Sequence, residues 1–346
     1  MMGTDSVFLP HILFFIGSAL ASALIGIPVI RLLKKLHLGQ PINEYLPEHK
    51  GKEGTPTCGG LIFILPALLV YMAARLYLTF SVSENASSLY KLDMIVLLAV
   101  LNAMIGLADD ILKLRKKKNP SLKRFELDNE GLRRYHKLGL QALAAAAVLA
   151  LGWFSGAVET LFVFGTNAYD IGFWYYVLAF LFILFIENAV NLTDGLDGLA
   201  GSISVIVLLF AGLTYLTSGM SLLLLGLGGS VLGFLLFNTF PAKVFMGDFG
   251  SLFIGSVLAG FAVFSNRILF VLILTIPFAI EFFSSLLQVL VFKITKKLLK
   301  REEGIRILPK APLHHTFQAI HWSEPVIVTA FDFLTVLCGF GALFIR

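Results

Sequence analysis

The sequence predicts an all-α integral membrane protein with about ten transmembrane helices. Of its 346 residues, 57% are hydrophobic and 14% are charged, and the mean hydropathy is +0.85, which is far from the average of soluble proteins. The apolar runs suit helices, which need about 20 residues to cross a bilayer, whereas the strands of a membrane barrel are about ten residues long. The expected spans are residues 8–31, 58–80, 93–112, 138–155, 172–189, 199–217, 221–238, 250–265, 268–292 and 325–345.

Each span is an apolar run that ends at polar or charged residues. The first, from Val7 to Ile30, lacks a basic leader and a small-residue cleavage site, so we expect it to remain as a span. The sixth and seventh are separated only by residues 217–220, but joining them would produce an apolar run too long for one crossing. Residues 1–346 are therefore expected to form a single polytopic membrane domain.

Basic residues indicate the orientation. Lys and Arg gather in residues 31–52, 113–137 and 293–310 and at Lys243, which together hold 23 of the 27 basic side chains. These segments follow the first, third, seventh and ninth expected spans, so all of them lie on the same side of the membrane. Because cytoplasmic loops carry the excess of Lys and Arg, we expect both termini outside the cytoplasm. The segments 111–138 and 293–324 become cytoplasmic basic loops. This face would attract anionic lipid heads and phosphorylated substrates, and no nucleic-acid partner is needed to explain the charge.

Five aspartates lie at the edges of the apolar spans. They are Asp109, Asp110, Asp194, Asp197 and Asp248, and the orientation places all of them at the cytoplasmic face. Carboxylates are costly at bilayer depth and usually mark ion, proton or substrate sites there. The sequence therefore predicts a metal-dependent active site at this face.

Asp109 and Asp110 end the third span, where the partial negative charge of a helix C-terminus opposes them. A positive group is needed to compensate. Lys113 or Lys116 would suffice without any catalysis, but we favour a divalent cation or a role in handling substrate.

The segment from Asn188 to Gly201 packs two asparagines, two aspartates and three glycines between spans. Such a turn can present carboxylates, amides and backbone N–H groups to one ligand. The structural alternative is a polar turn in which Asp197 or Thr193 caps a helix, but a cap needs only one such residue.

Asp248 precedes the eighth expected span, so Asp248 or Ser251 would cap that helix or Asp248 would bind Mg²⁺. His314 and His315 fall in the last basic loop and lack the further ligands of a zinc site. They would hydrogen-bond phosphate or a nucleotide, or simply be solvated. In residues 292–301, apolar side chains one turn apart among lysines predict a helix that leaves the bilayer and lies on its inner surface. We assign no chemistry to the insertion at 116–137.

Several motifs together resemble a known family. They are Thr55-Pro-Thr-Cys-Gly-Gly60, Gly106-Leu-Ala-Asp-Asp110, Asn188-Ala-Val-Asn-Leu-Thr-Asp-Gly-Leu-Asp-Gly198, Pro241-Ala-Lys-Val-Phe-Met-Gly-Asp248 and Ala311-Pro-Leu-His-His315. In this order they resemble the phospho-N-acetylmuramoyl-pentapeptide transferases, a family of polyprenyl-phosphate N-acetylhexosamine-1-phosphate transferases. The resemblance covers nearly the whole chain. Departures occur at Thr316, Cys58 and Phe249, where histidine, methionine and a small residue are usual.

The resemblance implies a Mg²⁺-dependent reaction in peptidoglycan synthesis. Phospho-MurNAc-pentapeptide would pass from UDP-MurNAc-pentapeptide to undecaprenyl phosphate in the bacterial cytoplasmic membrane, giving lipid I and UMP, and the resemblance allows a homodimer. An alternative is a related transferase that uses a UDP-N-acetylhexosamine for another surface polymer. A secondary transporter is disfavoured, because transporters place their substrate sites near the midplane of the membrane, often between repeated halves, whereas the five aspartates are expected at one face.

The resemblance also implies residue roles. Asp248 would bind Mg²⁺, while Asp109 or Asp110 would act as a general base or, in a two-step route, as a nucleophile. The substrate-binding residues would be Gly195, Leu196, Asp197, Asn238 and Phe245 for uridine, Lys113 and Lys137 for phosphate oxygens, and Lys52, Thr57, Asn188, Asn191, Asp194, Gln288, His314 and His315 lining the pocket.

Overall fold

The computed structural model describes residues 4–36, 54–81, 86–118, 131–216, 219–300 and 302–346. Within these ranges, nine helices are long and apolar enough to cross a membrane, so the predicted class of all-α membrane protein is confirmed. The elements are α1 (Thr4–Lys35), α2 (Leu61–Ser81), α3 (Ala86–Lys118), α4 (Arg134–Phe154), β1 (Leu161–Phe164), β2 (Asn167–Asp170), α5 (Phe173–Thr193), α6 (Leu199–Thr214), α7 (Met220–Asn238), α8 (Gly247–Phe264), α9 (Ile268–Leu274), α10 (Ile276–Leu298), α11 (Leu313–Ala319) and α12 (Glu324–Leu343).

Two of the expected spans differ from the observed helices. The sixth corresponds to α6, an apolar helix of 16 residues, which is shorter than the expected 19 and than a typical span of about 20 residues. The ninth, expected as one helix over 268–292, is broken into α9 and α10 at Thr275. Pro277 stands in the first turn of α10, where its missing N–H costs nothing, and it starts a new helix there.

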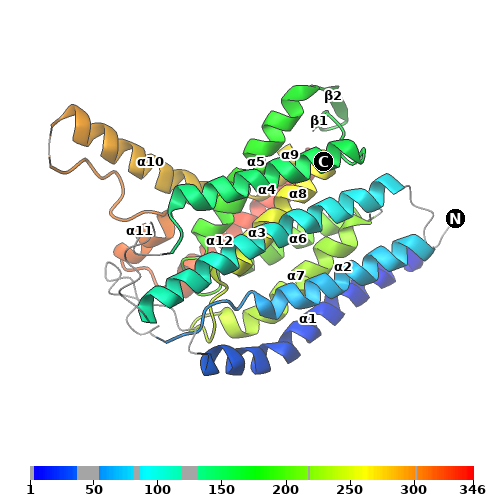
Figure 1. The fold of residues 1–346 in the computed structure, drawn as a ribbon, viewed down its shortest axis with the longest axis horizontal. Coiled ribbons are helices and arrows are strands. Elements are labelled where there is room, and N and C mark those ends of the chain that lie inside the picture. Colours follow the sequence, from blue (N-terminus) through cyan, green and yellow to red (C-terminus); the bar gives the residue numbers. More distant parts are fainter. Residues whose placement is uncertain (1–3, 37–53, 82–85, 119–130, 217–218, 301) are drawn as a thin grey trace.

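A short β-hairpin joins α4 to α5, where the prediction had only a connection. Strand β1 pairs antiparallel with β2, from Leu161 opposite Asp170 to Phe164 opposite Asn167. The first strand consists of Leu-Phe-Val-Phe, and Gly165 adopts a φ of +58° in the turn, as tight hairpins require. The hairpin lies at the end of the bundle opposite α11 (Figure 1).

Helices α7 and α8 form the centre of the bundle and are its most buried spanning helices. Helix α8 packs against α3 and α5, while α7 packs against α1, α2 and α6. Helices α3 and α5 end at the same end of the bundle at which α8 begins. Side chains on the last turns of the first two and the first turn of the third can therefore meet.

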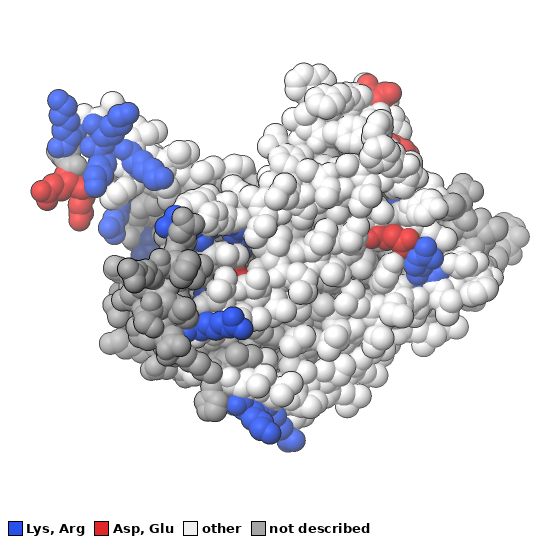
Figure 2. All heavy atoms as spheres, in the orientation of Figure 1, with Lys and Arg blue, Asp and Glu red and all other residues white. Residues whose placement is uncertain are grey.

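The C-terminal half of α10 projects away from the bundle (Figure 1). Its Ile294 and Leu298 side chains are 53% and 74% exposed, and Lys296 and Lys297 lie in its last turn. The predicted helix with apolar and basic residues therefore exists as the continuation of α10, while its position relative to a bilayer remains a prediction. On the face seen in Figure 2, Lys and Arg gather at this end of the molecule, and most of the middle band is free of charge.

Candidate functional site

The site begins with a close contact between α3 and α8. A Cβ atom on Gly106 of α3 would lie 2.2 Å from the carbonyl oxygen of Asp248, so only glycine permits the two backbones to approach this closely. Asp109 follows Gly106 by about one helical turn and points to the same side. The contact thus places Asp109 beside the first turn of α8.

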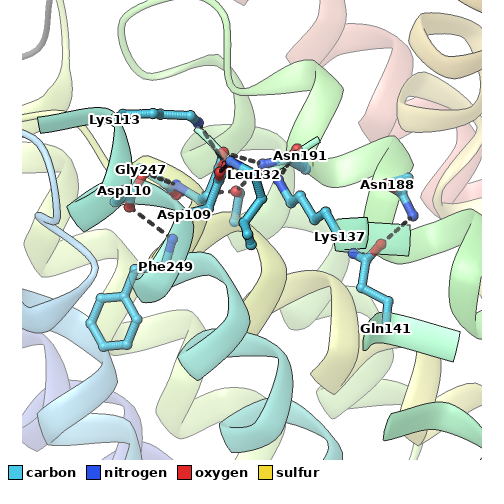
Figure 3. A network of polar contacts seen from close by, with 12 residues as sticks. Asp109, Asp110, Lys113, Leu132, Lys137, Gln141, Asn188, Asn191, Gly247 and Phe249 are labelled. Atoms are coloured by element: carbon cyan, nitrogen blue, oxygen red, sulfur yellow. Dashed lines mark hydrogen bonds and ion pairs between the residues drawn. The ribbon is translucent and has the colours of Figure 1, made fainter. Parts of the chain in front are cut away.

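The Asp248 carboxylate is the centre of a polar cluster from four helices. Its Oδ2 atom lies 2.7 Å from Lys113 Nζ and 2.8 Å from Lys137 Nζ. Its Oδ1 atom accepts a hydrogen bond of 2.7 Å from the Asn191 amide, which also donates to Ser251 Oγ at 2.8 Å. Helices α3, α4, α5 and α8 each contribute one or more of these groups, and Figure 3 shows the lysines and Asn191 converging there.

Asp109 belongs to the same cluster. Its Oδ2 atom lies 3.0 Å from Lys113 Nζ and 3.7 Å from Lys137 Nζ, and its Oδ1 atom accepts the Leu132 N–H at 2.7 Å. The side chain is buried. Lys113 therefore compensates the charge of Asp109, as expected if the pair had only a structural role. Its shorter ion pair, however, is with Asp248, which a purely structural role of Asp109 and Lys113 did not predict.

Asp110 faces different groups from Asp109. Its two carboxylate oxygens accept the backbone N–H groups of Asp248 at 3.2 Å and Phe249 at 3.1 Å. These are among the N–H groups that a helix start leaves without partners, so Asp110 caps α8 from a neighbouring helix. Gly247 has a φ of +74°, and a Cβ atom there would lie 2.5 Å from Asp110 Oδ2.

The turn between α5 and α6 contains the predicted Asp194, Gly195, Leu196 and Asp197. Asp194 is partly buried, and burial together with the nearby carboxylates of Asp248 and Asp110 raises its pKa to about 8. Leu196 is buried in the core.

Asp197 and Asn238 hold the segment that leads to α8. Asp197 is buried and accepts the Ala242 N–H at 2.9 Å, and the Asn238 amide donates to the Val244 carbonyl oxygen at 2.9 Å. Phe245 is partly buried and is joined to residues 56 and 59 by backbone hydrogen bonds. Among the predicted uridine-binding residues, these three therefore shape one loop.

One face of α10 holds the segment that carries the two histidines. Gln288 accepts the N–H groups of Ile307 and Leu308, both at 3.0 Å, and Ser284 accepts that of Leu313 at 3.0 Å. Glu281 accepts the N–H of His314 at 3.1 Å. Gln288 was predicted to line the substrate pocket, but in this structure its amide oxygen accepts from the backbone of the loop.

His314 is fully buried in a pair with Glu281. Its Nδ1 atom lies 2.8 Å from Glu281 Oε2, and its Nε2 atom has no hydrogen-bond partner in the described part of the chain. A Cβ atom on Gly195 would lie 2.3 Å from Nε2, so the imidazole packs directly on the turn after α5. His315 instead hydrogen-bonds Gln318, with 2.8 Å between Nδ1 and Oε1.

The remaining predicted residues lie around this centre. Asn188 sits one turn before Asn191 and donates to Gln141 at 3.2 Å, beside the cluster (Figure 3). Thr57 is buried, and its hydroxyl would lie 2.9 Å from a Cβ atom on Gly247. Lys52 falls outside the described residues, as does the side chain of Lys116.

The structure thus brings Asp109, Lys113, Lys137, Asn191 and Asp248 into direct contact, and it adds two groups that were not predicted from the sequence, the Leu132 N–H and Glu281. The Leu132 N–H carried no signal, because a backbone donor after an insertion cannot be located from sequence. Glu281 did carry one, since an acid inside an apolar span is costly and marks a specific role.

The described residues contain no group of three His, Cys, Asp or Glu side chains arranged to hold a metal. Magnesium, however, often takes one or two carboxylates and completes its shell with waters and substrate phosphates. Asp248 and Asp109 both offer carboxylate oxygens in the cluster. The donor chemistry therefore fits this ion.

The sequence is similar to known proteins over most of its length. Residues 92–266 match the model of glycosyl transferase family 4. A phospho-N-acetylmuramoyl-pentapeptide-transferase of Clostridium botulinum is 36% identical over 329 residues, which cover 93% of each chain. The proteins of that name from Clostridium beijerinckii and Symbiobacterium thermophilum are each 37% identical, over 94% and 91% of this chain and 94% and 89% of their own.

The chain belongs to the phospho-N-acetylmuramoyl-pentapeptide-transferase family.

The matched region of glycosyl transferase family 4 includes Asp109, Lys113, Lys137, Asn191 and Asp248. His314 and Glu281 lie beyond it, in a part of the chain that the relatives also cover. The carboxylate and lysine cluster therefore lies within the region that matches the family model, whereas the α10–α11 segment lies outside it.

Proposed function

We propose that the protein transfers phospho-MurNAc-pentapeptide from UDP-MurNAc-pentapeptide to undecaprenyl phosphate, giving lipid I and UMP. The observation that supports this most directly is the cluster in which Lys113 and Lys137 meet the carboxylates of Asp109 and Asp248. Phosphoryl transfer needs positioning and neutralisation of oxygen charge more than covalent chemistry by the protein. Two lysines and two carboxylates at the end of a membrane bundle provide both.

In the proposed reaction, an oxygen of the lipid phosphate attacks the phosphorus next to the sugar. A new pyrophosphate bond forms, the old one breaks, and the bridging oxygen leaves with UMP. Lys113 and Lys137 would exchange part of their contact with carboxylates for contact with diphosphate oxygens. No covalent intermediate with the protein is needed.

Asp109 is the better placed of the two neighbouring aspartates to act as general base. Its carboxylate lies in the lysine cluster, whereas both oxygens of Asp110 are occupied by the N-terminus of α8. The second ionisation of a phosphate lies near neutral pH, so removing its proton is a modest task.

Magnesium would be held by Asp248, with Asp109 nearby, and would supply charge neutralisation at the transferred phosphate. Asn191 keeps the Asp248 carboxylate in place through its hydrogen bond of 2.7 Å.

We further propose that the protein lies in the cytoplasmic membrane of a bacterium, where this end of the bundle faces the cytoplasm and both termini lie outside. We also propose that it forms a homodimer.

The test uses the purified protein with radiolabelled UDP-MurNAc-pentapeptide and undecaprenyl phosphate. We expect labelled lipid I and an equal amount of UMP with Mg²⁺, and neither after removal of divalent cations. Asp248→Ala should abolish this turnover while the protein remains folded. UMP release with UDP-GlcNAc alone would instead assign the protein to the sister transferases, and full activity of Asp248→Ala would overturn the metal assignment.

A further inference from the structure

A fully buried acid lies below the site and takes no part in the proposed chemistry. Glu187 of α5 has no exposed surface, and neither do Asn102 of α3 and Ser256 of α8. Its Oε1 atom accepts hydrogen bonds from Asn102 Nδ2 at 2.8 Å and from Ser256 Oγ at 2.7 Å. Its Oε2 atom has no partner in the described part of the chain.

Asn102 has a matching unsatisfied atom. Its Nδ2 group also donates to the Leu98 carbonyl oxygen at 3.2 Å, so both amide hydrogens have acceptors. This fixes the orientation of the amide and leaves Oδ1 as an acceptor, and Oδ1 has no partner among the residues that the structure describes. The unsatisfied atoms are thus two oxygens on two groups that are already joined through their other atoms.

A single proton resolves this arrangement. An ionised Glu187 would place a charge in the apolar interior, which is costly without a cationic partner. None of the ion pairs among the described residues involves Glu187. A proton on Oε2 removes the charge and turns that oxygen into a donor. The acid and the amide would then pair through two hydrogen bonds, the observed one from Asn102 Nδ2 to Oε1 and a second from Oε2–H to Asn102 Oδ1.

We propose that Glu187 is a neutral glutamic acid, paired with Asn102 through its proton, and that it acts as a positioning residue for the site. The second half of this proposal rests on the proposed function. Asn102 precedes Asp109 by seven residues on α3, Glu187 precedes Asn191 by four on α5, and Ser256 follows Asp248 by eight on α8.

At 3.6 residues per turn these separations are about 1.9, 1.1 and 2.2 helical turns, so each member of the buried group lies on or next to the helix face that carries a member of the site. The same three helices therefore meet twice, once in the lysine and aspartate cluster and once at Glu187. Gly255 permits the lower contact, because a Cβ atom there would lie 2.8 Å from the Glu187 Cα atom. Fixing the rotation of the helices at Glu187 fixes where Asp109, Asn191 and Asp248 point.

Infrared difference spectroscopy tests the proton. We expect the spectrum of the wild type minus that of Glu187→Gln at neutral pH to contain the C=O stretching band of a protonated carboxyl, shifted in D₂O. The matched control is Glu159→Gln, because Glu159 is half exposed and pairs with Lys91; its difference spectrum should contain carboxylate bands only. Carboxylate bands alone for Glu187 would overturn the proposal and indicate a water or a monovalent cation between the two oxygens.

Two substitutions test the positioning role. Glutamine places an NH₂ group where the acid has its O–H, so Glu187→Gln should keep both the thermal midpoint and the turnover of the wild type. Methionine has a similar volume but leaves Asn102 and Ser256 unsatisfied. Glu187→Met should lower the midpoint and, with little change in KM, lower turnover by about 10²-fold, the cost of a misplacement of about 1 Å.

The outcomes separate this proposal from the proposed function. A Glu187→Met protein with wild-type midpoint and turnover would overturn the positioning role, and a Glu187→Gln protein that loses turnover would do the same. Should Glu187→Met fail to fold, the spectra and the Glu187→Gln protein still decide. Absence of lipid I formation by the wild type would defeat the proposed function but leave the infrared and stability results intact.

Discussion

Asp109 and Asp110 are adjacent in the chain, yet their side chains serve different neighbours. Asp109 faces two lysines and the Leu132 N–H, and Asp110 faces the first N–H groups of α8. Successive residues on a helix point about 100° apart, so the two side chains can contact different neighbouring elements. The sequence alone does not distinguish their roles, because the direction from which α8 approaches is set by distant residues.

Substitution should separate the two aspartates. Asp109→Asn should lower kcat by about 10²- to 10⁴-fold, the usual contribution of a general base, and should reduce the free energy of unfolding less than the loss of the α8 cap does, because the amide oxygen can still accept the Leu132 N–H and Lys113 keeps its ion pair with Asp248. Asp110→Ala should reduce the free energy of unfolding by about 0.5–2 kcal/mol, the usual cost of losing a helix cap. Chemical denaturation and steady-state kinetics on both proteins measure these effects. Equal loss of stability in the two variants would contradict the assignment.

Asp194 should make stability depend on pH. Its pKa is raised to about 8 by burial and by neighbouring carboxylates, so between about pH 4 and 8 the folded protein keeps a proton that the unfolded chain has released. Stability should therefore fall as pH rises through this window and level off above it. The thermal midpoint of Asp194→Asn should fall less over the same window, and parallel curves for the two proteins would count against the shifted pKa.

At the scale of elements, the contact between α3 and α8 determines the site. Gly106→Ala would push a methyl group against the Asp248 carbonyl oxygen, a backbone atom that cannot turn aside. We expect a lower thermal midpoint and a large loss of turnover. The matched control is Gly139→Ala in α4, where a Cβ atom meets nothing within 4 Å and the better helix propensity of alanine favours stability by about 1 kcal/mol. Equal behaviour of the two variants would show that the contact is not tight.

The apolar runs predicted most helices well, because a span of about 20 apolar residues has few other solutions. The break at Thr275 was missed because residues 268–292 are predominantly apolar on both sides of it, and Pro277 alone does not distinguish a kink from a new helix. The β-hairpin was missed because its four-residue strands fall within a short connection between spans. Both features depend on packing that periodicity does not report.

At the scale of the whole molecule, the site likewise combines residues that were predicted from the sequence with contacts that depend on the fold. Aspartates at span edges were visible in the sequence, and the structure brings Asp109 and Asp248 together. The partners of Glu187, Glu281 and Gln288 were not visible, because each acts on a segment or helix that only the fold brings near.

Membrane orientation can be measured with single cysteines. Cys338→Ser removes one native thiol, and Cys58 can remain, because burial and the neighbouring Asp110 raise its pKa to about 12 and keep it unreactive. An impermeant maleimide added to intact cells should label a cysteine at exposed Thr166 in the hairpin. One at exposed Glu303 should react only after permeabilisation. The parent protein should remain unlabelled, and labelling of both positions from one side would contradict the orientation.

The ion pairs of Lys113 and Lys137 with Asp248 bear on the design of inhibitors. A compound with a cationic amine would have to displace two tethered ammonium groups from the same carboxylate oxygen. An anionic compound that draws the lysines away would leave that carboxylate without a counterion. A rigid compound that carries both an amine and an anionic group should therefore bind more tightly than a compound with either charge alone. Its anionic group would pair with the lysines while its amine replaces them at the carboxylate.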